Sequence, residues 1–344
     1  MNKSLSSKVF IKLIISLIIL FFAFVLAILL GAEKLKFSTI LGQGDKFENI
    51  IFFRLRLPRA LLVLFTGILL GGSGAVFQLF FRNPLAEPGI MGISSGATLG
   101  AVIASVIGVG GITLSGNSNL LTGGSFTFTL ISPINFCAFL GALGSGILVT
   151  ALAFSKTGRN STIMLLLCGT ALGTFYSSVS SMVLLTGKKE LHSIYSWILG
   201  SFSGRGWNEL LFISIPGLAA IIIMFCISRP LDLLSGGETS AASLGVQVDK
   251  IRILVLISGA LAVSAAVCAG GTISFVGLIA PHVVRKILGP KGRILIPFSM
   301  IFGAILLLLA DTIARILIAP AELPAGIITS ILGVPFFLGL CLKK

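Results

Sequence analysis

Long apolar stretches, separated by short polar segments, repeat along the whole of this 344-residue chain. Most of them reach about 20 residues, the length that an α-helix needs to cross the hydrocarbon core of a bilayer. The pattern predicts ten membrane-spanning helices within one domain, residues 1–344. The expected spans are 10–31, 60–80, 89–109, 134–154, 162–185, 210–228, 253–270, 272–288, 294–314 and 325–342.

Composition excludes a soluble globular domain. The chain is 56% hydrophobic and only 10% charged, whereas about a quarter of the residues in a soluble domain carry charge. In lipid, every backbone polar group must be satisfied within the protein, and continuous apolar runs of this length achieve that as helices. We therefore expect an all-α polytopic membrane protein in which the first span, 10–31, is retained rather than cleaved as a signal peptide.

The net charge of +14 lies mainly in short polar segments between the apolar runs. This placement indicates orientation in the membrane rather than a nucleic-acid partner. An even number of spans puts both termini on one side, and more Lys and Arg residues fall inside when that side is cytoplasmic. The resulting topology has cytoplasmic loops at 81–88, 155–161, 229–252 and 285–293 and external segments at 32–56 and 187–209.

Three arginines in "FRLRLPRALL", Arg54, Arg56 and Arg59, then lie outside, against the usual preference for cations on the cytoplasmic side. The spans otherwise contain few ionisable residues, which argues against a self-contained ion-coupled transporter or channel, the alternative function. Asp311 is the main exception, and Arg315 follows it by four residues. This spacing predicts an ion pair on one helical face.

The sequence offers no energy source and no catalytic set. It lacks the G-x-x-x-x-G-K-[ST] phosphate-binding loop, and neither His192 nor His282 stands in a catalytic pattern. We therefore expect no enzyme activity and no cofactor, with any ATP hydrolysis on a separate subunit.

The longest cytoplasmic loop contains a short predicted helix, about 236–244. Ser235 and Glu238 fit a capping box at its start, and Gly245 fits a C-terminal cap. A helix this short needs a neighbour to hold it. That neighbour is either its own bundle or a cytoplasmic partner.

Several segments resemble, in order, the FecCD-type permeases, the membrane subunits of bacterial importers for ferric siderophores, haem and cobalamin. They are "LRLPRALLVLFTGILLGGSGAVFQLFFRNPLAEPGIMGISSGA" (55–97), "GGETSAASLGVQVDKIR" (236–252), "SFVGLIAPHVVRKILGPKGR" within 274–317, and 322–340. The resemblance implies ten helices in a type II ABC importer permease of the bacterial cytoplasmic membrane. Its partners would be a second permease chain (the same or homologous), two ATPase subunits, membrane lipid and an external binding protein, and no nucleic acid. On family frequency a ferric siderophore is the first substrate, then haem, then cobalamin.

The resemblance also assigns roles to residues. Arg56, Arg59 and Arg315 match positions that dock the binding protein through its glutamates, while Arg54 has no match and is expected to be solvated. The short cytoplasmic helix would couple the permease to the ATPase through Glu238, Ala241, Ala242, Leu244 and Gly245. In "YSSVSSM" (176–182), Ser177, Ser178 and Ser181 are candidate pathway-lining residues, with helix packing as the alternative.

Overall fold

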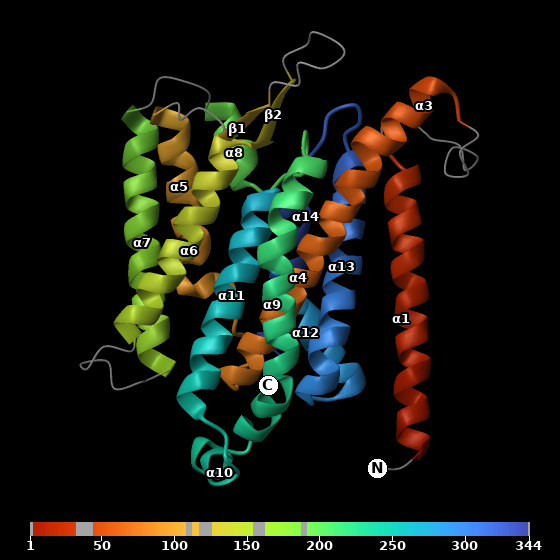
Figure 1. The fold of residues 1–344 in the computed structure, drawn as a ribbon. Helices are drawn as coiled ribbons and strands as arrows, with labels where there is room; N and C mark the ends of the chain where they lie inside the picture. The colour runs from red at the N-terminus through yellow and green to blue at the C-terminus, as the bar shows by residue number, and fades with distance from the viewer. Residues whose placement is uncertain are drawn as a thin grey trace.

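The computed structural model describes residues 3–31, 44–107, 112–116, 126–153, 162–186 and 191–342. Its long helices stand side by side in one bundle, with α1 at one edge and α7 at the other (Figure 1). The helical elements are α1 (Lys3–Leu29), α3 (Lys46–Ile50), η1 (Ile51–Arg56), α4 (Leu57–Phe80), η2 (Pro88–Met91), α5 (Ile93–Ile107), α6 (Pro133–Ala153), α7 (Thr162–Thr186), α8 (Leu191–Ile198), α9 (Trp207–Leu234), α10 (Glu238–Ser243), α11 (Val248–Gly270), α12 (Val276–Leu288), α13 (Gly292–Ile316) and α14 (Ala325–Cys341).

The predicted all-α polytopic fold is confirmed. A described helix covers most of each of the ten expected spans, and α11 ends at Gly270, where the sequence predicts a break. Seven described helices are long and apolar enough to cross a bilayer, and two further apolar helices, Ile93–Val106 and Ala325–Leu340, are shorter. The expected loop 155–161, with parts of 32–56 and 187–209, lies outside the described residues.

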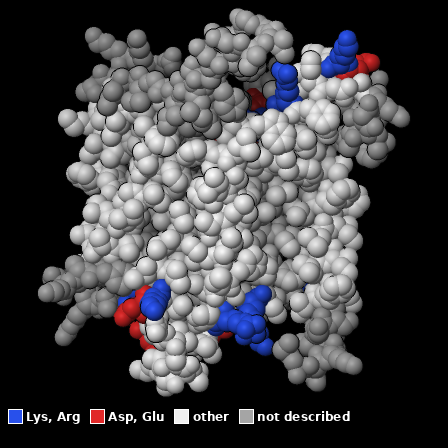
Figure 2. Space-filling model, in the orientation of Figure 1, with Lys and Arg blue, Asp and Glu red and all other residues white. Residues whose placement is uncertain are grey.

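A short antiparallel hairpin, which the hydrophobic pattern did not predict, joins β1 (Ile112–Gly116) to β2 (Phe126–Ile131). It lies with α3 at the end of the bundle opposite α10 (Figure 1). On the face seen in Figure 2, the coloured charged side chains gather near the two ends and leave an uncharged band between them. This distribution is typical of a protein that spans a bilayer.

The second span is longer than predicted, because α3, η1 and α4 form one continuous helix from Lys46 to Phe80. Its middle portion, η1, is a π-helix that ends at Arg56, and Pro58 follows in the first turn of α4. Proline lacks the N–H that an α-helical hydrogen bond requires, so the regular ladder is interrupted near this point. Such π segments are frequent at functional sites, and this one carries Arg54 and Arg56.

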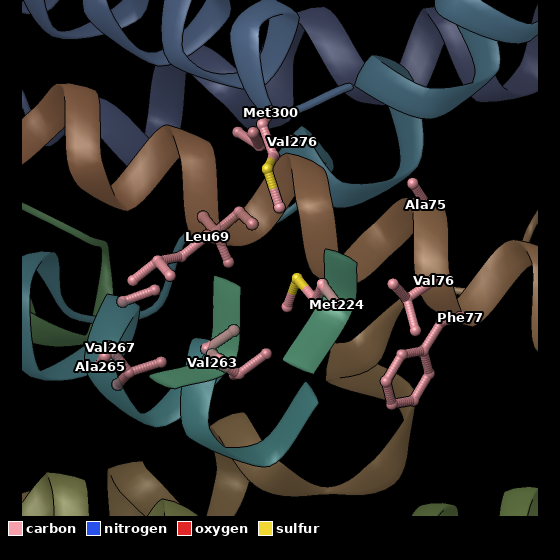
Figure 3. Packing of buried hydrophobic residues seen from close by; sticks show 14 of the residues in the cluster. Leu69, Ala75, Val76, Phe77, Met224, Val263, Ala265, Val267, Val276 and Met300 are labelled. Atoms are coloured by element: carbon pink, nitrogen blue, oxygen red, sulfur yellow. The ribbon is translucent and has the colours of Figure 1, made fainter. Parts of the chain in front are cut away.

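Helix α4 occupies the centre of the bundle, where small residues allow neighbouring backbones to approach closely. A Cβ at Gly67 would lie 2.6 Å from the Gly303 carbonyl oxygen of α13, and one at Gly71 would overlap the Ser299 carbonyl oxygen. Beside this contact, Met300 of α13 and Met224 of α9 (both labelled in Figure 3) approach Gly72 of α4, where an added Cβ would lie 2.7 Å from Met300 Cε and 3.1 Å from Met224 Sδ. The position of α13, and of any group on it, therefore depends on glycine in α4.

We predict that Gly71→Ala destabilises the protein by about 1–3 kcal/mol, because the added methyl group forces α4 and α13 apart. The measurement is thermal unfolding in detergent. Gly144→Ala is the matched control, since a Cβ there would meet nothing within 4 Å. Equal melting temperatures for the two variants would refute the importance of this contact.

Candidate functional site

Arg56, at the end of η1, is buried, although the sequence suggested an external contact residue. Its Nη1 donates hydrogen bonds of 2.8 Å to the carbonyl oxygens of both Ile28 and Leu29. The last carbonyl groups of a helix have no partner within the helix, and cations near that end are favoured. Arg56 therefore caps α1.

Arg315, near the end of α13, binds the same end of α1. Its Nη2 donates to the Ala27 carbonyl oxygen at 2.7 Å and its Nη1 to that of Leu30 at 3.0 Å. Its Nε lies 3.1 Å from Asp311 Oδ2, which confirms the predicted ion pair. The last turn of α1 is thus held by two guanidinium groups from different helices.

Arg59 links the cluster of Arg56, Arg315 and Asp311 to the surface. Its Nη2 lies 2.9 Å from Asp311 Oδ1, and its Nη1 contacts both carboxylate oxygens of Glu322, at 2.8 and 3.1 Å. Asp311 is 2% exposed and bridges Arg59 and Arg315. The structure therefore brings Arg59 and Arg315 together on one buried carboxylate, while Arg56 joins Arg315 at the end of α1.

These arginines line a cavity of about 850 Å³ at the end of the bundle opposite α10. Its basic lining residues are Arg54, Arg56, Arg59, Arg205 and Arg315, and its acidic ones are Glu209 and Glu322. Basic groups outnumber acidic ones, so the cavity suits a carboxylate or another anion.

Sequence reasoning missed two of the cavity's cations. Arg54, expected to be merely solvated, is exposed but lines the cavity. Arg205 donates to Asn135 Oδ1 at 2.9 Å and to the Cys268 carbonyl oxygen at 2.8 Å. The π segment that carries Arg54 has no sequence pattern of its own, and Arg205 depends on partners far away in the chain.

At the opposite end, α10 projects below the bundle (Figure 1). The predicted C-terminal cap is confirmed: Gly245 has φ +84, its N–H donates to the Ala242 carbonyl oxygen at 2.9 Å, and the Val246 N–H reaches that of Ala241 at 3.0 Å. These two bonds form a Schellman motif.

The predicted capping box is wrong. The helix begins after Gly237, whose φ of +118 suits glycine. The Ser235 hydroxyl instead donates to the Asp232 carbonyl oxygen at 2.6 Å, and Glu238 Oε1 lies 3.2 Å from Arg252 Nη2. The ion pair to Arg252 fastens α10 to α11 and replaces the reciprocal cap.

Most of α10 faces outward. Ala241 is buried against the bundle, whereas Glu238, Ala242 and Gly245 are exposed and Leu244 is 66% exposed. An exposed leucine among small side chains, on a helix held at both ends, offers a neighbouring protein a surface of defined shape.

Helix α7 lies at one edge of the bundle (Figure 1). It exposes several hydroxyl-bearing side chains. Thr174, Ser178 and Ser181 donate to the carbonyl oxygens four residues earlier, at 3.0, 2.9 and 3.0 Å. Ser177, Ser178 and Ser181 are all exposed. Because the hydroxyls of Thr174, Ser178 and Ser181 are satisfied within their own helix, this side of α7 is a weakly polar, uncharged surface.

Comparisons with known proteins agree with this architecture. A model of the FecCD transport family matches residues 18–343. The chain is 38% identical to the cobalamin import system permease protein BtuC of Halobacterium salinarum, over 84% of this chain and 73% of that protein. It is 32% identical to the iron(3+)-hydroxamate import system permease protein FhuG of Bacillus subtilis, over 99% of both.

A solved structure, described as an inward-facing conformation of a metal-chelate type ABC transporter, superposes with a TM-score of 0.82. That likeness covers 97% of this chain and 99% of the other, at 32% identity. A family match over nearly the whole chain and a matching fold settle its class. The chain belongs to the FecCD transport family and is a multi-pass ABC importer permease.

Proposed function

We propose that this permease moves a metal chelate inward across the cytoplasmic membrane, driven by ATP hydrolysis on two partner ATPase subunits. An external binding protein delivers the chelate, and a second permease chain, the same or homologous, completes the pathway. The observation that most supports this proposal is the pairing of a basic cavity at one end of the bundle with an exposed, anchored helix at the other.

A ferric siderophore is the substrate we propose, before haem and cobalamin. Two relatives are named for the import of iron(3+)-hydroxamate and of cobalamin, which are bulky metal chelates. The exposed hydroxyls of α7, including Ser177, Ser178 and Ser181, supply a lining without fixed charge. Uptake of the three labelled chelates by cells lacking and regaining this chain separates the candidates.

The second permease chain would cover the outer face of α7. Phe175, Met182 and Leu185 are exposed there beside the hydroxyl groups, and the exposed fraction of Leu185 reaches 89%. On α14, Ile331 and Leu338 are likewise exposed. A dimer that pairs these two helices would bury the apolar side chains and enclose the polar stripe as a path.

The external docking site we propose includes Arg56, Arg59 and Arg315. Arg56 and Arg315 hold α1, so they contribute fixed positive charge, whereas Arg59 has a replaceable partner. The Glu322 side chain is 33% exposed, so an incoming carboxylate can take its place on Arg59. Arginine suits this exchange because its planar guanidinium group can donate two parallel hydrogen bonds to one carboxylate.

The coupling site we propose is α10 with its caps: Glu238, Ala241, Ala242, Leu244 and Gly245. Ala241 and the pair of Glu238 with Arg252 fasten the helix to the bundle. Ala242 and Leu244 face outward toward the ATPase. Motion of the ATPase would therefore pass through α10 to α9 and α11.

We predict that both termini and α10 are cytoplasmic and the arginine cavity is external. In a cysteine-free background, cysteines that replace Ser235 and Gly44 should react from opposite sides of the membrane. An impermeant thiol reagent applied to intact cells, with any outer membrane permeabilised, should label only the second. Labelling of both from outside would contradict this topology.

We predict that Ala242→Arg abolishes transport but leaves the permease folded, because its side chain obstructs a close contact at an exposed position. Uptake and co-purification with the ATPase are the measurements. Ala242→Ser, which adds a single oxygen atom, is the control and should retain both. If Ala242→Arg also retains uptake and co-purification, α10 packs on its own bundle and does not contact the ATPase.

We predict opposite effects of two charge changes on association with the binding protein. Arg54→Glu should slow association about tenfold at low salt, because steering by the cavity weakens. Glu322→Gln should speed it, because Arg59 loses the carboxylate that competes with the partner. Association rates are measured with the purified permease complex at two salt concentrations.

Lys46→Glu is the matched control, since Lys46 is exposed near the same end but does not line the cavity. If Lys46→Glu slowed association as much as Arg54→Glu, the effect would come from the overall charge of this end of the protein and not from the cavity. A slower rate for Glu322→Gln would contradict the exchange at Arg59.

A further inference from the structure

Two non-helical segments meet inside the bundle at Glu87, the last residue of the first segment, whose residues 82–84 are exposed. One, residues 81–87, leads from α4 toward η2 and α5, and the other, residues 271–275, joins α11 to α12. Helices α5 and α12 contain only 15 and 13 residues, fewer than a membrane span requires. Non-helical backbone at such depth is tolerated only where protein or a polar cavity surrounds it.

Glu87 connects the two segments. Its Oε1 accepts a hydrogen bond of 3.0 Å from the backbone N–H of Phe275, at the start of α12. The carboxylate lines a cavity of about 290 Å³, and so does Leu70, from the middle of α4. Among the described residues that line this cavity, Glu87 alone is ionisable. An acid at this depth is costly, and acids in such places are usually functional.

Phe275 is held in an unusual backbone conformation. Its φ is +69, in the left-handed region that residues other than glycine rarely adopt. The carbonyl oxygen of Phe275 accepts from the N–H groups of Leu278 and Ile279, at 3.1 and 2.8 Å, and so begins α12. An outlier of this kind persists only where its surroundings enforce it. The hydrogen bond that the Phe275 N–H donates to Glu87 is one such constraint.

The side chain of Phe275 contacts α14, so the conformation of Phe275 affects the position of that helix. Its ring packs against Gly333, where an added Cβ would overlap it. The neighbouring Thr272 donates its hydroxyl hydrogen to the Ile198 carbonyl oxygen of α8. Gly200, just after α8, accepts from the Gly326 N–H of α14 at 3.0 Å. The segment 271–275 therefore touches α8, α12 and α14 together.

We propose that Glu87 is a positioning residue for transport, which latches Phe275 in its left-handed conformation and thereby fixes α14 relative to α12. With the latch released, Phe275 relaxes to an ordinary backbone conformation, its ring leaves Gly333, and α14 shifts. The role in transport rests on the proposed function, since α14 borders the pathway only in that arrangement. The latch itself is a property of this chain alone.

The test compares Glu87→Leu with Glu87→Gln in the full-length protein in detergent, by amide hydrogen exchange. The leucine removes the acceptor, so exchange at Phe275 and in the start of α14 should quicken about tenfold or more. The glutamine keeps an acceptor oxygen and should preserve the protection. If Glu87→Leu fails to fold, Glu87→Asp carries the same test, because its shorter side chain withdraws the carboxylate from Phe275.

Asp232→Leu is the matched control, since Asp232 accepts from the Gly292 N–H at the start of α13. It should loosen α13 without changing exchange in α14. Unchanged exchange at Phe275 and α14 in both Glu87→Leu and Glu87→Asp would overturn the latch.

The role in transport is tested with the assembled complex in liposomes, by substrate moved per ATP hydrolysed. This ratio should fall severalfold in Glu87→Leu and recover in Glu87→Gln. An unchanged ratio with altered exchange would overturn the positioning role. If the wild-type complex moves no chelate, the proposed function fails, while the exchange measurements still decide the latch.

Discussion

The close contact between α4 and α13 determines much of the rest of the structure. In a bilayer, packing rather than the hydrophobic effect brings helices together, so small residues set how near two backbones come. Gly67 and Gly71 of α4 face Gly303 of α13 without side chains between them. Because α4 carries Arg59 and α13 carries both Asp311 and Arg315, this separation also sets the geometry of the buried ion-pair cluster. Packing in the middle of the bundle and the arrangement of charges at the end opposite α10 therefore depend on the same pair of helices.

The cluster of Arg56, Arg59, Arg315 and Asp311 gives these cations a structural role whichever side of the membrane they face. Arg56 and Arg315 satisfy the last carbonyl groups of α1, a helix that otherwise exposes most of its apolar side chains. An external role for these arginines and a structural one are compatible, because a guanidinium that holds a helix end still contributes its charge to the cavity. The two roles differ in consequence. Removing Arg56 or Arg315 disturbs the fold, whereas changes at Arg54 or Glu322 alter the cavity from its exposed side.

Local sequence features predicted the elements that depend on local physics. Apolar length gave the spans, the i to i+4 spacing gave the pair of Asp311 with Arg315, and a glycine after a short helix gave the cap at Gly245. Contacts between distant segments could not be predicted from local sequence features. Arg315 donates to carbonyl groups 285 and 288 positions away, and Glu238 pairs with Arg252 instead of forming a capping box. Glu87 looked like a loop residue because no pattern in the sequence tells that its loop re-enters the bundle.

The two ends of the bundle are linked through the segments that interrupt it. Helix α10 is fastened to α11 by the pair of Glu238 with Arg252, and α11 runs from there to Gly270, where the chain breaks before α12. Beyond that break lie Phe275 and its contact with α14, next to the end of α8. Helix α11 therefore has α10 fastened at one end and a strained break at the other. Close-packed interiors shift between discrete arrangements rather than deform smoothly. A displacement of α10 would for this reason become a change of backbone conformation at the break. On this reasoning, α11 is the element through which a partner bound at α10 would act on the upper half of the bundle.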